Sequence, residues 1–132
     1  MDAHTVLIVD DNREALDRWA KGLQECSSRY NVLKANTVRS ALDLCRYQRI
    51  DCVVLDLDMN EASGFEVLFS LIPDRRHPQI AVVVLTRLVS SSLHEMAVEF
   101  GAMASLVKRL TSPQQLHTAI QTAIASTQAP GT

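Results

Sequence analysis

Residues 53–60 read VVLDLDMN, a short apolar run that ends in two aspartates one residue apart. A run of this length, rich in β-branched side chains, is too short for a buried helix and predicts a strand. Similar runs are TVLIV, IAVVVL and MASLV, with a weaker, alternating one in YNVLKA (residues 5–9, 80–85, 103–107 and 30–35). Because the runs are almost continuously apolar, we expect most of these strands to be buried on both faces, as in a parallel sheet.

Helical patterns alternate with these strands. Apolar side chains recur at three- and four-residue steps, with polar residues opposite, over residues 12–26, 38–48, 64–72, 93–100 and 113–126. Strands that alternate with amphipathic helices predict a doubly wound α/β fold, a (βα)5 three-layer sandwich with right-handed crossovers.

Start and stop signals agree with these helices. Pro113 stands at a favourable first helical position, and Gly101 predicts the end of the fourth helix. Three pairs have the spacing of a capping box: Ser63 with Glu66, Ser92 with Glu95, and Ser112 with Gln115. We expect one domain over residues 1–126 and a linker-like or frayed tail over 127–132.

Composition narrows the classes of function. The chain of 132 residues has a net charge of −2 and only 5% aromatic residues, which gives no reason to expect nucleic acid or an anionic membrane as a partner. The N-terminal sequence is not a signal peptide, and no apolar run is long enough to span a bilayer. The three cysteines lack metal-site spacing and are interpreted as free thiols, so we expect a soluble, cytoplasmic protein.

Polar side chains stand at the carboxyl ends of several predicted strands, where doubly wound sheets bind their ligands. Each one alone has an ordinary explanation, such as a helix cap, a turn or a solvated lysine. Their joint placement at one rim is much harder to explain that way. These residues are Asp10, Asp11, Asp56, Thr86 and Lys108.

The three carboxylates in this group indicate a divalent cation, because without one they would raise one another's pKa. A set of oxygen ligands with room for water suits Mg²⁺. The sequence has no glycine-rich phosphate loop, so a small phosphoryl group is expected rather than a nucleotide. An aspartate beside Mg²⁺ can attack phosphorus and form an aspartyl-phosphate.

Five segments in this order resemble the receiver domain of bacterial response regulators. They are LIVDDN, VVLDLDM, SG, VVVLT and GAMASLVK (residues 7–12, 53–59, 63–64, 82–86 and 101–108). Each is weak alone, but their order and spacing are specific, and the resemblance covers about residues 5–126. It implies a flavodoxin-like sheet of five parallel strands in the order 2-1-3-4-5.

The resemblance also implies roles for individual residues. Asp56 matches the phosphoacceptor, Thr86 the switch hydroxyl and Lys108 the lysine that neutralises phosphoryl charge. Mg²⁺ would be held by Asp10, Asp11, Asp56 and the backbone carbonyl of Asp58. The implied donor is the phosphohistidine of a histidine kinase or of a histidine phosphotransfer protein, and slow Mg²⁺-dependent hydrolysis would follow.

The chain departs from the family pattern at four positions. Asn60 replaces a common proline, Arg87 a small residue, Ser105 an aromatic that reports the switch, and Arg109 a proline after a cis bond. Because a cis bond before a non-proline residue costs about 2.5–4 kcal/mol, we expect a trans Lys108–Arg109 peptide and a shifted loop. Without an aromatic at Ser105, the usual route from Thr86 to the surface is not available in its common form.

Arg87 and Asp58 are expected to modulate the site. The Arg87 side chain could pair with the Asp58 carboxylate or reach the phosphoryl group, and crowd the attacking water. A solvent-pointing Arg87 is the equally weighted alternative, since exposed ion pairs are often worth little.

Two other functions are weighed against a phosphorylated signalling switch that is not an enzyme beyond its own phosphorylation and dephosphorylation. One is a degenerate scaffold that is never phosphorylated. The other is a Mg²⁺-dependent phosphatase of the haloacid-dehalogenase type, which DLD (56–58) resembles, although that family has its acidic motifs in the reverse order. The downstream protein target stays open, as does whether the domain acts alone or in a longer chain, and a homodimer is possible.

Overall fold

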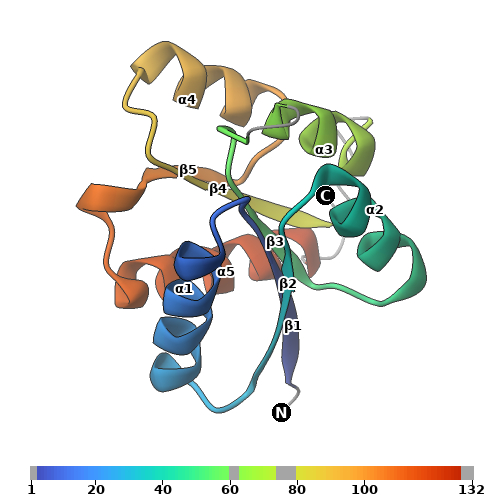
Figure 1. Cartoon of the computed structure of the whole chain (residues 1–132), viewed down its shortest axis with the longest axis vertical. Coiled ribbons are helices and arrows are strands. Elements are labelled where there is room, and N and C mark those ends of the chain that lie inside the picture. Colours follow the sequence, from blue (N-terminus) through green and yellow to red (C-terminus); the bar gives the residue numbers. More distant parts are fainter. Residues whose placement is uncertain (1–2, 60–62, 74–79, 129–132) are drawn as a thin grey trace.

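The computed structural model describes residues 3–59, 63–73 and 80–128, and these residues form a single parallel sheet flanked by helices (Figure 1). The strands are β1 (His4–Val9), β2 (Tyr30–Ala35), β3 (Cys52–Leu55), β4 (Ala81–Thr86) and β5 (Ala104–Val107). The helices are α1 (Arg13–Cys26), α2 (Val38–Tyr47), α3 (Gly64–Leu71), α4 (Ser91–Glu99) and α5 (Pro113–Gln128), with a short 3₁₀ turn, η1 (Lys108–Leu110).

The strand order is β2-β1-β3-β4-β5 and all neighbours run parallel, which confirms the predicted fold and order. Val9 is in register with Leu55, and Leu55 with Val84. The backbone continues this alignment for one residue, because the Asp56 N–H donates to the Val9 carbonyl at 3.0 Å. The residues that follow β1 and β3 therefore lie side by side at one edge of the sheet.

Two apolar cores fill the space between the sheet and its two helix layers. Alternate strand residues such as Val6 and Ile8 face the layer of α1 and α5, together with Leu23 and Ile120. The intervening residues, such as Leu7, face the layer of α2, α3 and α4. Figure 1 shows the two layers on opposite sides of the sheet. Burial on both faces explains why the sequence of these strands is apolar throughout.

Most helix ends follow the sequence signals. Ser63 caps α3 as expected, but its hydroxyl accepts from the Phe65 N–H at 3.1 Å and not from the Glu66 N–H. Ser112 and Gln115 form the full reciprocal capping box, with bonds of 2.8 and 3.1 Å, and Gly101 follows α4 with a φ of +114°, as a residue without Cβ readily does. The prediction that Ser92 caps α4 is wrong. Ser90 is the cap, because its carbonyl accepts the first helical bond from the His94 N–H and its hydroxyl accepts from the Leu93 N–H.

Three further predictions concern the Lys108–Arg109 peptide, the cysteines and the end of α5. The Lys108–Arg109 peptide is trans, as predicted, and opens the η1 turn. The cysteines are free thiols; burial raises the pKa of Cys45 to about 11 and that of Cys52 to about 12. α5 runs two residues past the predicted end at 126, to Gln128. Asn60 lies outside the described residues.

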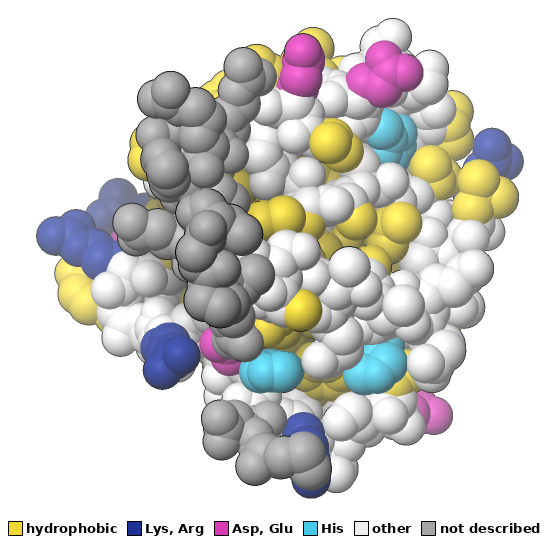
Figure 2. Space-filling view, turned by 180° about the vertical axis from the view of Figure 1, so that it is seen from behind, with side chains coloured by type: hydrophobic (Ala, Val, Ile, Leu, Met, Phe, Trp, Pro, Cys, Tyr) yellow, Lys and Arg dark blue, Asp and Glu magenta, His cyan; other side chains and the backbone are white. Residues whose placement is uncertain are grey.

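The face shown in Figure 2 has hydrophobic and uncharged side chains at its centre, and its basic side chains lie apart toward the margin. This distribution differs from the continuous basic stripe that is typical of nucleic-acid-binding surfaces. Within the described part of the chain, no helix has the length and apolarity needed to cross a membrane.

Candidate functional site

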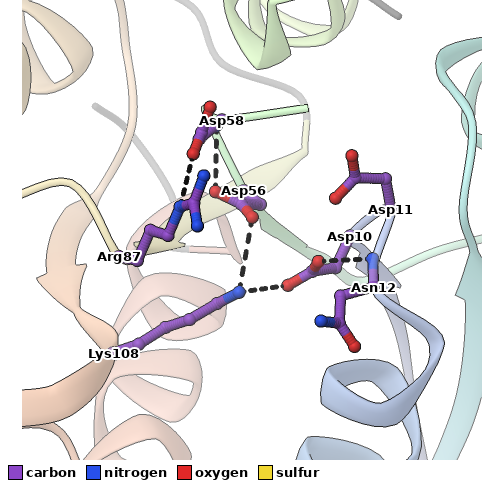
Figure 3. Close-up of a pocket in the computed structure, with 7 residues that line it drawn as sticks. All are labelled: Asp10, Asp11, Asn12, Asp56, Asp58, Arg87 and Lys108. Carbon is purple, nitrogen blue, oxygen red and sulfur yellow. Dashed lines mark hydrogen bonds and ion pairs between the residues drawn. The ribbon is translucent and has the colours of Figure 1, made fainter. Parts of the chain in front are cut away.

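An acidic pocket of about 260 Å³ opens at the carboxyl edge of the sheet (Figure 3). It is lined by Asp10, Asp11, Asn12, Asp56, Asp58, Arg87 and Lys108. Asp10 and Asp56 follow directly after β1 and β3, and Lys108 follows β5. The topology thus brings together residues that are up to 98 positions apart in the sequence.

Asp56 is held in one orientation by contacts to both carboxylate oxygens. The Asp58 N–H donates to Oδ1 at 2.9 Å, and the Lys108 ammonium donates to Oδ2 at 3.3 Å. The hydroxyl of Thr86, which is fully buried at the end of β4, also favours the charged form of this carboxylate and lowers its pKa. A carboxylate fixed in this way needs little reorganisation before it reacts.

The protonation of Asp56 reflects opposing effects. Burial raises its pKa above the usual value, because the side chain is only 3% exposed and the charged form loses its hydration. The bonds from Thr86 and Asp58 and the charge of Lys108 act in the opposite direction, while the charge of Asp10 adds to the rise. The net direction is upward, because the loss of hydration on burial outweighs the contacts that favour the charged form.

Asp10 is the second buried carboxylate of the pocket. Its Oδ1 accepts from the Asn12 N–H at 2.9 Å, and its Oδ2 contacts the Lys108 ammonium. Asn12 in turn caps α1, because its side chain accepts from the Ala15 N–H at 3.0 Å. Asn12 is thus the cap of α1, while Asp11 lines the pocket.

The carboxylates of Asp10, Asp11 and Asp56 each offer an oxygen, and these three oxygens lie within 4.8 Å of one another. An all-oxygen set of this kind suits a hard cation such as Mg²⁺. The raised pKa of Asp56 fits the same conclusion, because a cation between the carboxylates would favour their charged forms.

Arg87 and Asp58 form an ion pair at the rim of the pocket, with 2.6 Å between Nε and Oδ2 (Figure 3). The Arg87 side chain is 78% exposed and that of Asp58 33%. The contact raises the pKa of Arg87 further above its usual range. Arg87 thus points across the pocket rim and not away from it, although it stays accessible to water.

Sequence reasoning did not identify two features of the site. The His94 ring on α4 bridges Ser105 on β5 and the carbonyl of Leu88, and no periodic pattern predicted this contact. Gly64 at the start of α3 packs on the backbone after β3, where an added Cβ would lie 2.1 Å from the Asp56 carbonyl oxygen. The SG pair at 63–64 was a usable signal for this close approach.

A family model and several related proteins point to the same protein family. Residues 6–121 match the family model described as the response regulator receiver domain. The polar-differentiation response regulator DivK of Brucella anthropi is 30% identical over 114 residues, which cover 86% of this chain and 91% of that protein. A probable cyclic di-GMP phosphodiesterase of Vibrio cholerae is 29% identical over 120 residues, and here the match covers 89% of this chain but only 26% of the relative.

Solved structures with a similar fold include a CheY-like receiver domain of Methanospirillum hungatei, with a TM-score of 0.85, 22% identity and coverage of 98% of this chain and 100% of that one. A response regulator of Burkholderia pseudomallei, described with a phosphorylated aspartic acid, a calcium ion and citrate, has a TM-score of 0.79 and 26% identity. The match covers 95% of this chain and 71% of that one.

Proposed function

Because this chain belongs to the family of response regulator receiver domains of two-component signalling, we propose that it accepts a phosphoryl group on the carboxylate of Asp56. One observation carries the proposal: a buried carboxylate, oriented by Thr86 and Lys108, lies among further carboxylates that suit a divalent cation. This is the arrangement expected of a nucleophile for phosphoryl transfer.

The donor is a phosphohistidine of a histidine kinase or a histidine phosphotransfer protein. A carboxylate oxygen of Asp56 attacks phosphorus and forms a P–O bond as the P–N bond breaks. The electron pair of the P–N bond stays on the imidazole nitrogen, so the donor leaves as a neutral ring when its other nitrogen carries a proton. Deprotonated Asp56 is required, because a protonated carboxyl group is a poor nucleophile.

The other residues act on charge and orientation. Lys108, already within 3.3 Å of Asp56, offsets the negative charge that the phosphoryl group brings, and the Thr86 hydroxyl donates to one of its oxygens. Asp10, Asp11, Asp56 and the backbone carbonyl of Asp58 would hold Mg²⁺, which when bound neutralises charge on the transferring group. Arg87, tied to Asp58, restricts the approach of water to the phosphorylated site.

A similar protein of known structure supports this proposal. The Burkholderia pseudomallei response regulator is described with a phosphorylated aspartic acid and a calcium ion. The consequence of phosphorylation would be an altered interaction with a downstream protein, or with a second copy of this chain.

Intact-mass measurement tests the proposal directly. Incubation with phosphoramidate or acetyl phosphate and Mg²⁺ should add about 80 Da to the wild type and nothing to Asp56→Asn. Asp43→Asn, which changes an exposed aspartate on α2, is the matched control and should gain the same mass as the wild type. A wild type without the mass gain would favour the scaffold alternative.

The phosphatase alternative predicts a different result. An enzyme of that kind would release phosphate from a generic aryl phosphate over many rapid turnovers, whereas a receiver domain could turn over no faster than phospho-Asp56 is slowly hydrolysed. Release of the aryl alcohol over many rapid turnovers, lost in Asp56→Asn, would support the phosphatase alternative against the signalling proposal.

A further inference from the structure

The His94 side chain on α4 is hydrogen-bonded through both ring nitrogens. Nε2 lies 2.8 Å from the carbonyl oxygen of Leu88, in the loop between β4 and α4. Nδ1 contacts the hydroxyl of Ser105 on β5. The ring is only partly exposed, so it connects the loop, the helix and the strand through contacts that are partly shielded from water.

The chemistry of these partners fixes the direction of each bond. A carbonyl oxygen only accepts, so Nε2 carries the proton and donates to Leu88. In the neutral ring, Nδ1 then accepts from the Ser105 hydroxyl, which can donate or accept. The bridge therefore requires a proton on Nε2, and the presence of that proton can be measured.

The bridge continues inward to the phosphoacceptor. The Leu88 N–H donates to the Thr86 Oγ1 at 3.4 Å, and the Thr86 hydroxyl acts on the Asp56 carboxylate, whose pKa it lowers. Leu88 thus contacts Thr86 through its N–H and His94 through its carbonyl. The result is one connected path that runs from Asp56 through Thr86, Leu88 and His94 to Ser105.

We propose that His94 is a positioning residue that couples the Thr86 hydroxyl to α4 and β5, at the place where Ser105 replaces the aromatic side chain usual in this family. The inference rests on the proposed function, because its signal is phosphorylation of Asp56. When the Thr86 hydroxyl turns toward a phosphoryl oxygen, its bond from the Leu88 N–H changes. His94 holds the carbonyl of the same residue, so the change reaches Ser105.

Two-dimensional amide NMR tests this path, with beryllofluoride and Mg²⁺ as the phosphoryl mimic. The Asp58 amide, which donates to Asp56, reports the site, and the Ser105 amide reports the far end. Both should shift in the wild type. In His94→Ala the Asp58 shift should persist and the Ser105 shift should be lost, while His94→Gln, whose amide can donate and accept, should recover part of it.

Glu95→Ala is the matched control, since Glu95 is the exposed neighbour of His94 on the same helix. It should respond as the wild type does. Ser105→Ala, which removes only the hydroxyl at the outer end, should lose the response at the adjacent Leu106 amide in the same way as His94→Ala. This second variant keeps the test valid if His94→Ala folds poorly.

A separate measurement distinguishes failure of this inference from failure of the proposed function. If the chemical shift of the Asp58 amide does not change on addition of beryllofluoride, the proposed function fails. The path is then tested without any phosphoryl mimic. Thr86→Val should shift the His94 ring nitrogens and the Ser105 amide by itself. An Nδ1–H tautomer, or a Ser105 response that is equal in His94→Ala and the wild type, would overturn the inference.

Discussion

The Arg87 Nε donates to the Asp58 Oδ2 at 2.6 Å, at the rim of the pocket that contains Asp56. This contact gives the two aspartates of VVLDLDMN different surroundings, although they are only two residues apart in the sequence. Asp56 is buried and faces Lys108, whereas the Asp58 side chain is one-third exposed and faces an arginine. One carboxylate is thus the proposed nucleophile, and the other forms an ion pair at the rim above it.

Arg87→Ala should shorten the lifetime of phospho-Asp56, by about threefold or more, because the rim then admits water more freely; a factor of three corresponds to about 0.65 kcal/mol in the barrier. The half-life is followed by intact mass after the phosphodonor is removed. Arg39→Ala, an exposed arginine on α2, serves as the control and should leave the half-life unchanged. Equal half-lives for Arg87→Ala and the wild type would show that Arg87 is a solvated side chain without influence on the site.

Asp58→Asn should reduce the effect of Arg87 on the half-life of phospho-Asp56, because the arginine loses the partner that holds it at the rim. In a double-mutant cycle, Arg87→Ala should change the half-life less in the Asp58→Asn background than in the wild type. The cost to the free energy of unfolding should stay below about 1 kcal/mol for each variant, since the pair is exposed. Strictly additive effects on the half-life would mean that the two side chains act independently.

Asp56→Asn should stabilise the metal-free protein at neutral pH and raise its Tm by a few degrees. The raised pKa means that the folded protein holds the Asp56 proton more tightly than the unfolded chain does. The stabilisation from this proton is fully present below the unfolded value of 3.8 and is lost as the pH rises through the higher pKa of the folded state.

Thermal unfolding of both proteins in EDTA, over a pH series from acid to neutral, checks this linkage. The Tm difference between Asp56→Asn and the wild type should grow as the pH rises and then level off. Mg²⁺ should narrow the difference, because it stabilises the charged carboxylate of the wild type. A difference that is constant with pH would contradict the raised pKa.

Lys108→Ala should destabilise the protein in EDTA by about 1–3 kcal/mol, because Asp10 and Asp56 lose the ammonium that lies between them. Mg²⁺ should then raise the Tm of the variant more than that of the wild type, since the cation replaces the lost positive charge. Lys34→Ala, which breaks the exposed pair with Asp17, is the control and should cost about 0–1 kcal/mol with an unchanged Mg²⁺ response. Equal Mg²⁺ gains in Lys108→Ala and the wild type would argue against a cation among these carboxylates.

Gly64→Ala should cost about 3 kcal/mol and slow phosphorylation, because the new Cβ would lie 2.1 Å from the Asp56 carbonyl oxygen and force the backbone after β3 to move. Chemical denaturation and the rate of mass gain with phosphoramidate measure the two effects. Ser70→Ala, on the exposed side of the same helix, should change neither by much. Normal stability and rate in Gly64→Ala would mean that α3 can shift without disturbing the site.

Much of the fold was predictable because its signals are local. Apolar runs such as CVVL identified strands, and three- and four-residue spacing identified helices, to within a few residues at each end. The start of α4 was the exception. Three consecutive serines, Ser90 to Ser92, all offer a capping hydroxyl, and the choice depends on which carbonyl accepts the first helical bond.

The candidate site was predictable only as a set of residue types at strand ends. Parallel strands place their carboxyl ends at one edge, so Asp10, Asp56 and Lys108 had to lie near one another. The roles of these residues in phosphoryl transfer stay predictions until the phosphodonor experiment is done. The position of the Arg87 side chain was left open between two alternatives, because a long flexible side chain has no local signal for its direction.

The sequence by itself determined the order of strands and helices, the burial of the sheet and the choice of acidic, hydroxyl and amine groups at its edge. These properties depend on periodicity and on the ends of short segments, which a linear chain records directly. Tertiary structure alone decided which groups touch: Arg87 with Asp58, Gly64 with the Asp56 carbonyl, and His94 with both Leu88 and Ser105. Such contacts depend on side-chain direction and on the register between distant segments, and both are fixed only when the sheet and its helices pack together.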